Sequence, residues 1–96
     1  MNVDDVKRVA RLLRQKFPEG TFGNLGMDEL LDMYAIFALT KGEKTTNRDV
    51  HHAWVLWARR YDPHNPDIRH YDDLPSEVKA EDSPFAHAIR SVAATL

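Results

Sequence analysis

Apolar side chains recur every three or four residues along most of the chain, which is the spacing of one face of an α-helix. Near the amino terminus, Asn2 stands in a helix-capping position, and Pro18 follows the last apolar residue of the first such pattern. We therefore expect a first helix over about Val3–Phe17. Its inner face is defined by Val6, Val9, Ala10, Leu13 and Phe17.

Two segments in the middle of the chain are apolar on every side. They are Met33–Leu39, with the sequence MYAIFAL, and Ala53–Ala58, with the sequence AWVLWA. A helix that is apolar all round is normally buried on several sides. A strand is the competing interpretation of Met33–Leu39, but its alanine content and the length of the pattern favour a helix. The pattern predicts a central pair of helices over about Met27–Lys41 and Asn47–Tyr61.

Residues typical of helix starts predict where the remaining helices begin. Thr46 and Asp49 have the spacing of a capping box ahead of the second central helix. After an irregular segment at residues 62–73, Pro75 and Pro84 each mark the beginning of a further helix, expected over 75–81 and 84–94. No segment predicts a sheet. The predicted fold class is all-α: a compact single domain over residues 1–96, with four to five helices and the central pair at 27–41 and 47–61.

Composition excludes several classes of protein. A chain of 96 residues makes one domain, and 43% hydrophobic with 29% charged residues is typical of globular proteins rather than disordered ones. No apolar run is long enough for a membrane span, and no signal peptide follows Met1. Cysteine is absent, which excludes disulfides, thiol catalysis and cysteine-based metal sites. We expect a protein of the cytoplasm with no membrane partner.

The distribution of charge along the chain indicates which classes of binding partner to expect. The net charge is −2, which makes nucleic acid an unlikely partner. Two features argue against interpreting the central pair as a helix-turn-helix. The link between the two helices is long, and the second helix is mostly apolar. The local exception is a basic stripe on the first helix, interpreted either as a solvated face or as a surface for a protein partner. Its candidate partner-binding residues are Lys7, Arg11 and Arg14.

Sequence motifs for catalysis and for metal binding are weak. The five histidines do not have the spacing that places two metal ligands on one helix face, so we expect no metal and no cofactor. No nucleophile motif or phosphate loop occurs. Aspartates in the irregular segment would serve acid–base chemistry if folding gathered them, and would otherwise form turns and caps. They are Asp62, Asp67, Asp72 and Asp73. We predict no catalytic residues and a protein that is not an enzyme.

The second half of the chain resembles the ryanodine-receptor repeat domain over residues 49–92. The matching elements are a His-x-x-Trp step at His51 and Trp54, a turn with Tyr71 ahead of Leu74-Pro75, and a Lys-x-x-Asp step ending at Asp82. The family usually has a glycine in the loop at Arg59–His70, and this chain has none. The resemblance implies a helical binding module.

The whole chain also resembles a group of small uncharacterised proteins from actinobacterial phages and their hosts. The similarity is carried by Lys41-Gly42-Glu43, by the segment from Asp49 to Trp54, and by Glu81 to Phe85. It implies a phage-encoded or host protein without an assigned mechanism.

Three functions follow from these observations. The first is a small non-enzymatic, phage-type accessory protein that contacts a host or phage protein. The second is a module for a small anionic, nucleotide-derived ligand, with aromatic rings for stacking and His and Arg for the anionic groups. Its candidate binding residues are His51, Trp54, Arg59 and Tyr71. The third is a hydrolase that uses the aspartates of residues 62–73. A homodimer is expected if Val55 and Leu56 are left uncovered.

Overall fold

The computed structural model describes residues 1–96 and contains helices but no strand, which confirms the all-α prediction. The α-helices are α1 (Val3–Arg14), α2 (Met27–Thr40), α3 (Asn47–Tyr61), α4 (Ser76–Ala80) and α5 (Ser83–Ala93). Two short 3₁₀ turns, η1 (Gly42–Lys44) and η2 (Tyr71–Asp73), lie in the connections. No helix has the length and apolar character needed to cross a membrane.

The helix starts follow the local chemistry of the sequence. The Asn2 side chain accepts a hydrogen bond from the backbone N–H of Asp5 at 2.9 Å, and Asp5 completes a capping box. Thr46 and Asp49 form the capping box predicted for α3. Such caps satisfy backbone N–H groups that have no partner inside the helix, which is why both helices begin where the sequence predicts.

The first helix ends earlier than predicted. It stops at Arg14 because the chain tightens into turns, in which the N–H of Phe17 bonds to the carbonyl of Arg14. This turn brings the Phe17 ring into a stack on Phe85, with centroids 5.0 Å apart. Pro18 disfavours a helical conformation at Phe17, and the turn that follows Arg14 places the Phe17 ring against Phe85.

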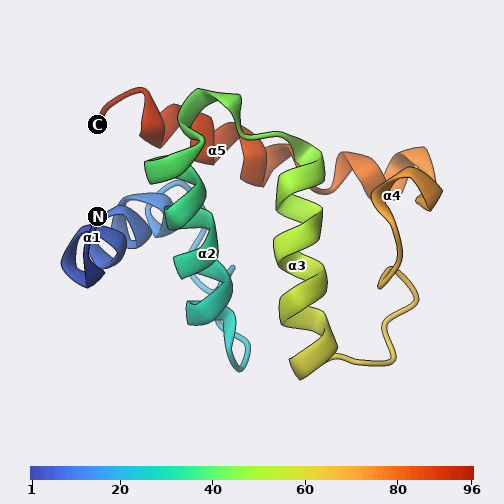
Figure 1. The fold of residues 1–96 in the computed structure, drawn as a ribbon. Helices are drawn as coiled ribbons and strands as arrows, with labels where there is room; N and C mark the ends of the chain where they lie inside the picture. The colour runs from blue at the N-terminus through green and yellow to red at the C-terminus, as the bar shows by residue number, and fades with distance from the viewer.

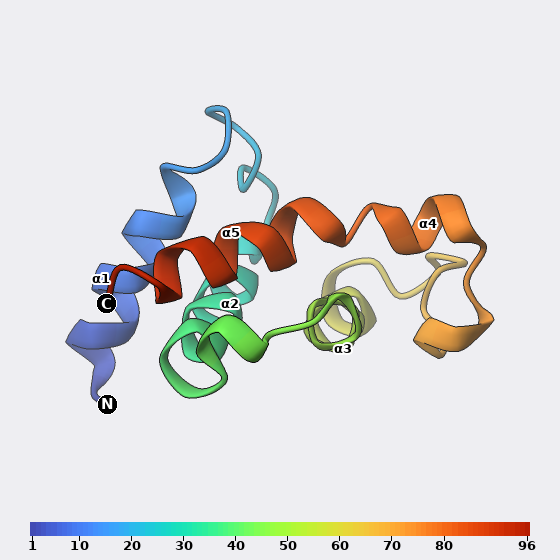
Figure 2. The same ribbon diagram turned by 90° about the horizontal axis from the view of Figure 1, so that it is seen from above.

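The helices α2 and α3 run antiparallel and side by side, and α5 crosses one end of the pair (Figures 1 and 2). The helix α1 packs against α2 and α5 on the side away from α3 (Figure 1). The core is shared by these four helices, with Leu13, Val50 and Ile89 fully buried. Trp57 belongs to this core, whereas Trp54 is only partly buried at its edge.

Candidate functional site

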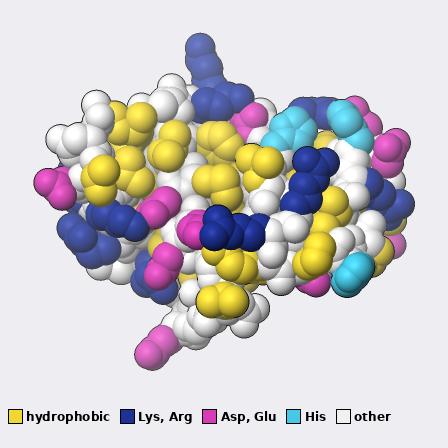
Figure 3. All heavy atoms as spheres, turned by 60° about the horizontal axis from the view of Figure 1, so that its bottom comes forward, with side chains coloured by type: hydrophobic (Ala, Val, Ile, Leu, Met, Phe, Trp, Pro, Cys, Tyr) yellow, Lys and Arg dark blue, Asp and Glu magenta, His cyan; other side chains and the backbone are white.

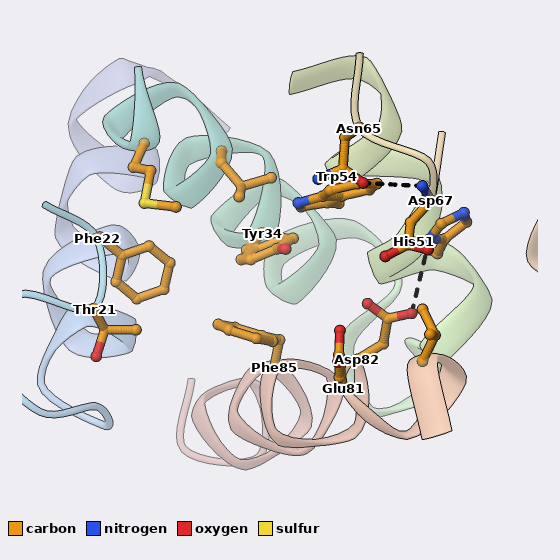
Figure 4. A pocket seen from close by; sticks show the side chains of 13 residues that line it. Thr21, Phe22, Tyr34, His51, Trp54, Asn65, Asp67, Glu81, Asp82 and Phe85 are labelled. Atoms are coloured by element: carbon orange, nitrogen blue, oxygen red, sulfur yellow. Dashed lines mark hydrogen bonds and ion pairs between the residues drawn. The ribbon is translucent and has the colours of Figure 1, made fainter. Parts of the chain in front are cut away.

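A cavity of about 230 Å³ lies where α2, α3 and the junction between α4 and α5 meet, and it is partly open at the surface (Figure 4). Four aromatic side chains from four different segments form most of its walls. Tyr34 comes from α2 and Trp54 from α3, while Phe85 comes from α5. Phe22 comes from the connection between α1 and α2, and its ring lies 6.1 Å from that of Phe85. The walls are thus built by tertiary packing of the whole chain.

A buried histidine lies beside this cavity. The Nε2 atom of His51 lies 2.7 Å from the backbone carbonyl oxygen of Arg69. Because a carbonyl only accepts hydrogen bonds, Nε2 carries a hydrogen, and in the neutral ring Nδ1 is therefore the unprotonated nitrogen. That Nδ1 atom lies 3.9 Å from Oδ2 of Asp82. The Trp54 ring stacks on the imidazole at 5.7 Å, so the histidine also supports one wall of the cavity.

The carboxylate of Asp82 is the most unusual group at the site. Asp82 occupies the N-cap position of α5, but it has helical backbone angles and its side chain caps nothing. No donor in the chain bonds to either of its oxygens, and Oδ2 is completely buried. Burial raises the pKa of Asp82 to about 6, although the nearby His51 acts in the opposite direction. The site therefore holds an acid that lacks the partners a buried carboxylate normally has.

Tyr34 contributes a second polar group with no partner. Its side chain is 3% exposed, and its hydroxyl makes no hydrogen bond within the chain. Burial, followed by the negative charge of Asp82, raises the pKa of this phenol. Tyr34 and Asp82 face the same space in Figure 4. Together they offer one hydroxyl and one carboxylate to whatever fills the cavity.

The charge of the lining is negative. Three carboxylates border the cavity, those of Asp67, Glu81 and Asp82, and no Lys or Arg side chain does. An anionic group would meet these carboxylates at short range in a partly desolvated space, where like charges repel strongly. The lining thus does not fit the anionic ligand that the sequence suggested, because the expected arginine lies elsewhere.

A family model described as a domain of unknown function (DUF7701) matches residues 4–94. The chain belongs to this family. The match spans α1 through α5, so the cavity and all of its lining lie within the family's domain. No curated protein and no solved structure matches the chain.

The four ligand-binding residues predicted from sequence do not all meet in this DUF7701 domain. His51 and Trp54 line the cavity together. Tyr71 lies 5.9 Å from the His51 ring but outside the lining, with Arg48 and Lys79 against its face. Arg59 is exposed and borders a different hollow, beside Leu56 and His70. Arg59 therefore does not line the cavity beside Trp54.

Sequence reasoning missed the residues from other elements. Tyr34 belongs to an apolar run that indicates only burial, and Phe85 follows Pro84 in a segment that predicts only a helix. Asp82 stands immediately before a Ser-Pro helix start, where aspartate usually caps the helix. No local signal distinguishes a capping aspartate from one that turns toward a distant histidine.

The basic stripe on α1 is largely neutralised by α2. Lys7 pairs with Asp32 at 2.6 Å, and Arg14 pairs with Asp28 at 2.5 Å. Arg11 borders the same hollow between the two helices without an ion pair. Two of the three candidate partner-binding cations are thus already engaged within the chain.

The aspartates of residues 62–73 have separate environments. Asp72 binds Arg48 through both oxygens, at 2.6 and 3.1 Å, and Asp62 accepts a hydrogen bond from Asn65. Asp67 borders the cavity and Asp73 is exposed. Across the chain, no three His, Asp or Glu side chains lie close enough to hold a metal ion.

An apolar strip is left uncovered between α2 and α3. Leu56 is 60% exposed and Ile36 is 38% exposed, and both border a shallow hollow with Met33 and Phe37. Val55 is partly buried. Figure 3 shows hydrophobic side chains on one face of the molecule, with charged side chains of both signs and His side chains among and around them.

Proposed function

We propose that this DUF7701 domain is a binding module, without a catalytic step, whose small ligand occupies the cavity beside Trp54. One observation carries the proposal: at the cavity, Oδ2 of Asp82 is buried without a hydrogen bond, and the Tyr34 hydroxyl beside the same space makes no hydrogen bond within the chain. A buried polar group without a hydrogen bond costs about 1–3 kcal/mol, so folded proteins rarely leave one unsatisfied without a reason. A ligand that donates a hydrogen bond to the Asp82 carboxylate recovers that cost.

The shape of the cavity supports the same function. Binding sites for small molecules are concave and mostly apolar, with a few polar groups that fix the orientation of the ligand. Here the aromatic walls supply the apolar surface, and the partly exposed Trp54 ring gives access from outside. The proposal keeps His51 and Trp54 from the ligand set predicted from sequence, and it replaces Arg59 and Tyr71 with Asp82 and Tyr34.

A ligand screen tests the proposal. Compounds of different charge are added to the purified chain, and the midpoint of thermal unfolding is measured. A ligand at 100 times its dissociation constant stabilises the folded state by about 2.7 kcal/mol. We expect hits whose effect disappears in Trp54→Leu, which removes the flat ring but keeps an apolar side chain. The matched control is Leu56→Ala, on the exposed side of the same helix.

Two results contradict the proposal. One is a screen in which no compound of any charge class stabilises the chain. The other is a set of hits that bind equally well to Trp54→Leu and to the unmodified chain, because such ligands occupy another surface.

Contact with a protein is the second candidate function, and the exposed Leu56 and Ile36 side chains favour it. Exposed apolar patches of this kind mark interaction surfaces in many soluble proteins. Sedimentation equilibrium distinguishes the outcomes: a mass that rises with concentration, and that returns to the monomer value in Leu56→Ser, identifies a homodimer through this strip. A constant monomer mass contradicts the homodimer.

Several predictions about relatives, location and partners rest on the sequence alone. The similarity to the ryanodine-receptor repeat at residues 49–92, the relation to phage and host proteins and the cytoplasmic location stay predictions. A host or phage partner for the stripe at Lys7, Arg11 and Arg14 also stays a prediction. Charge reversal at Arg11, which has no ion pair within the chain, tests the stripe without breaking the contacts of α1 with α2.

A further inference from the structure

The charged groups around the cavity determine which ligands it favours. Asp82 lies between α4 and α5, with Glu81 beside it in the chain and Asp67 contributed by the segment that follows α3. From α3 the only titratable group that borders the cavity is His51, and from α2 the only one is Tyr34. With a neutral histidine the ionised lining carries three negative charges, and with a protonated one it carries a net charge of −2. In either state a positive group is attracted.

Two cations near His51, Arg48 and Lys79, lie against the Tyr71 ring instead of the cavity. Arg48 and Lys79 lie 5.2 and 5.3 Å from the centre of the Tyr71 ring, and Arg48 also binds Asp72. Neither side chain borders the cavity. His51 is therefore the one side chain of the lining that can place a positive charge beside Asp82, and it does so only when protonated; with a neutral His51 the place of such a cation is open.

The aromatic walls select among positive ligands. The face of an aromatic ring attracts a cation that has shed part of its water, and indole attracts it most strongly. Trp54, Tyr34 and Phe85 present rings to the cavity, and no three acidic or histidine side chains converge as they would around a metal ion. Rings next to a single buried carboxylate suit an organic cation with an apolar body better than a hydrated inorganic ion.

We infer that the cavity binds a small free organic cation, namely a protonated amine on a compact apolar or aromatic body. This inference rests on the ligand-binding function proposed above. The ammonium group donates to the carboxylate of Asp82 and to the hydroxyl oxygen of Tyr34. The body of the ligand lies along Trp54 and reaches toward Phe22 and Phe85, and Glu81 adds negative charge at the exposed edge.

Three probes of nearly equal size and different charge test the inference: phenethylamine, 2-phenylethanol and phenylacetate. Binding at pH 7.5 is followed by the backbone and indole N–H signals of the labelled chain in NMR titrations. We expect the amine to bind at least tenfold more tightly than the alcohol, and the carboxylate to bind most weakly. The shifted signals should include the indole N–H of Trp54 and the amides around Asp82.

A matched pair of variants assigns the preference to one group. Asp82→Asn removes the buried charge, and we expect the amine to lose its advantage while 2-phenylethanol binds as before. Glu19→Gln removes an equal charge at an exposed position outside the cavity, and we expect it to leave the preference unchanged. A preference that survives in Asp82→Asn overturns the assignment.

The possible failures are distinguishable. If probes bind in a manner that depends on Trp54 but the alcohol or the carboxylate matches the amine, the cation assignment is wrong and the binding function stands. If none of these probes binds but the thermal screen finds other ligands that depend on Trp54, the cation assignment is wrong and the binding function stands; if the screen also finds none, both fail. A lysine side chain of a protein partner presents the same ammonium group, so Nα-acetyl-lysine methylamide is included as a fourth probe. Tighter binding of that compound than of phenethylamine overturns the assignment to a free ligand.

Discussion

Replacing Asp82 by asparagine should make the protein more stable at neutral pH. The substitution keeps the shape of the side chain and removes its charge. Burial raises the pKa of Asp82 from 3.8 in its ordinary state to about 6 in the folded chain. Folding therefore favours the protonated acid. Below pH 3.8 the group is protonated in both states and carries no electrostatic penalty. As the pH rises from 3.8 through 6, the folded state loses stability, and above that range the loss is complete.

The size of the effect follows from the same shift. A difference of about two pKa units corresponds to about 3 kcal/mol, which is a ceiling because the carboxylate borders a cavity that is partly open to the surface. Allowing for that exposure, we expect Asp82→Asn to stabilise the chain by about 1–2 kcal/mol at pH 7.5. For a domain of this length, that gain raises the unfolding midpoint by about 5–10 °C.

Urea unfolding at pH 3.5, 5, 6 and 7.5, followed by circular dichroism, measures the difference between the variant and the unmodified chain. The gain should be near zero at pH 3.5, grow through pH 5 and 6, and be complete at pH 7.5. Glu19→Gln should show no such dependence, since that side chain is exposed. A gain that is constant across the whole range, or a loss of stability at pH 7.5, refutes the reasoning that the ionised carboxylate is the source of the penalty.

Three further substitutions test the packing. In Gly26→Ala, the backbone φ of +77° and a new Cβ that collides with the Tyr61 ring should cost about 1–3 kcal/mol in urea unfolding. Thr46→Ala removes the cap that bonds to the N–H of Asp49 and should cost about 1 kcal/mol, with less helix signal in circular dichroism. In Trp57→Phe, the loss should stay below about 2 kcal/mol, because the buried indole N–H has no partner to lose; a larger loss indicates a bond formed in solution.

The parts of the fold that local chemistry determines could be read from the sequence. The capping side chains of Asn2 and Thr46 act within three residues of each helix start, so their effect is visible in the sequence itself. The end of α1 could not be found in this way. Pro18 marks a stop in this region, but the turns after Arg14 also place the Phe17 ring against Phe85 on the last helix, and no periodicity within the first segment contains that contact.

The same distinction applies to the candidate site: residues on one helix could be predicted together, and residues from different elements could not. His51 and Trp54 are three residues apart on one helix, so they share a face and meet at the cavity as expected. Arg59 is five residues beyond Trp54, a rotation of about 140° around a helix, and helical geometry alone places it on another face. Tyr34 and Asp82 come from other elements. Only the tertiary packing of α2, α3 and α5 brings them to the Trp54 ring.

The position of Asp82 lowers the stability of the fold, and in the proposed function the same position serves ligand binding. An aspartate that caps a helix stabilises it by about 1 kcal/mol, and Asp82 forgoes this contribution at α5. It instead places a carboxylate without hydrogen bonds beside a histidine and an aromatic cavity. Groups that weaken a fold in this way are expected where function requires them. One substitution tests both halves of this argument: Asp82→Asn should gain stability and lose the preference for an amine. If it gains stability and the preference remains, the carboxylate is a defect of packing with no part in binding.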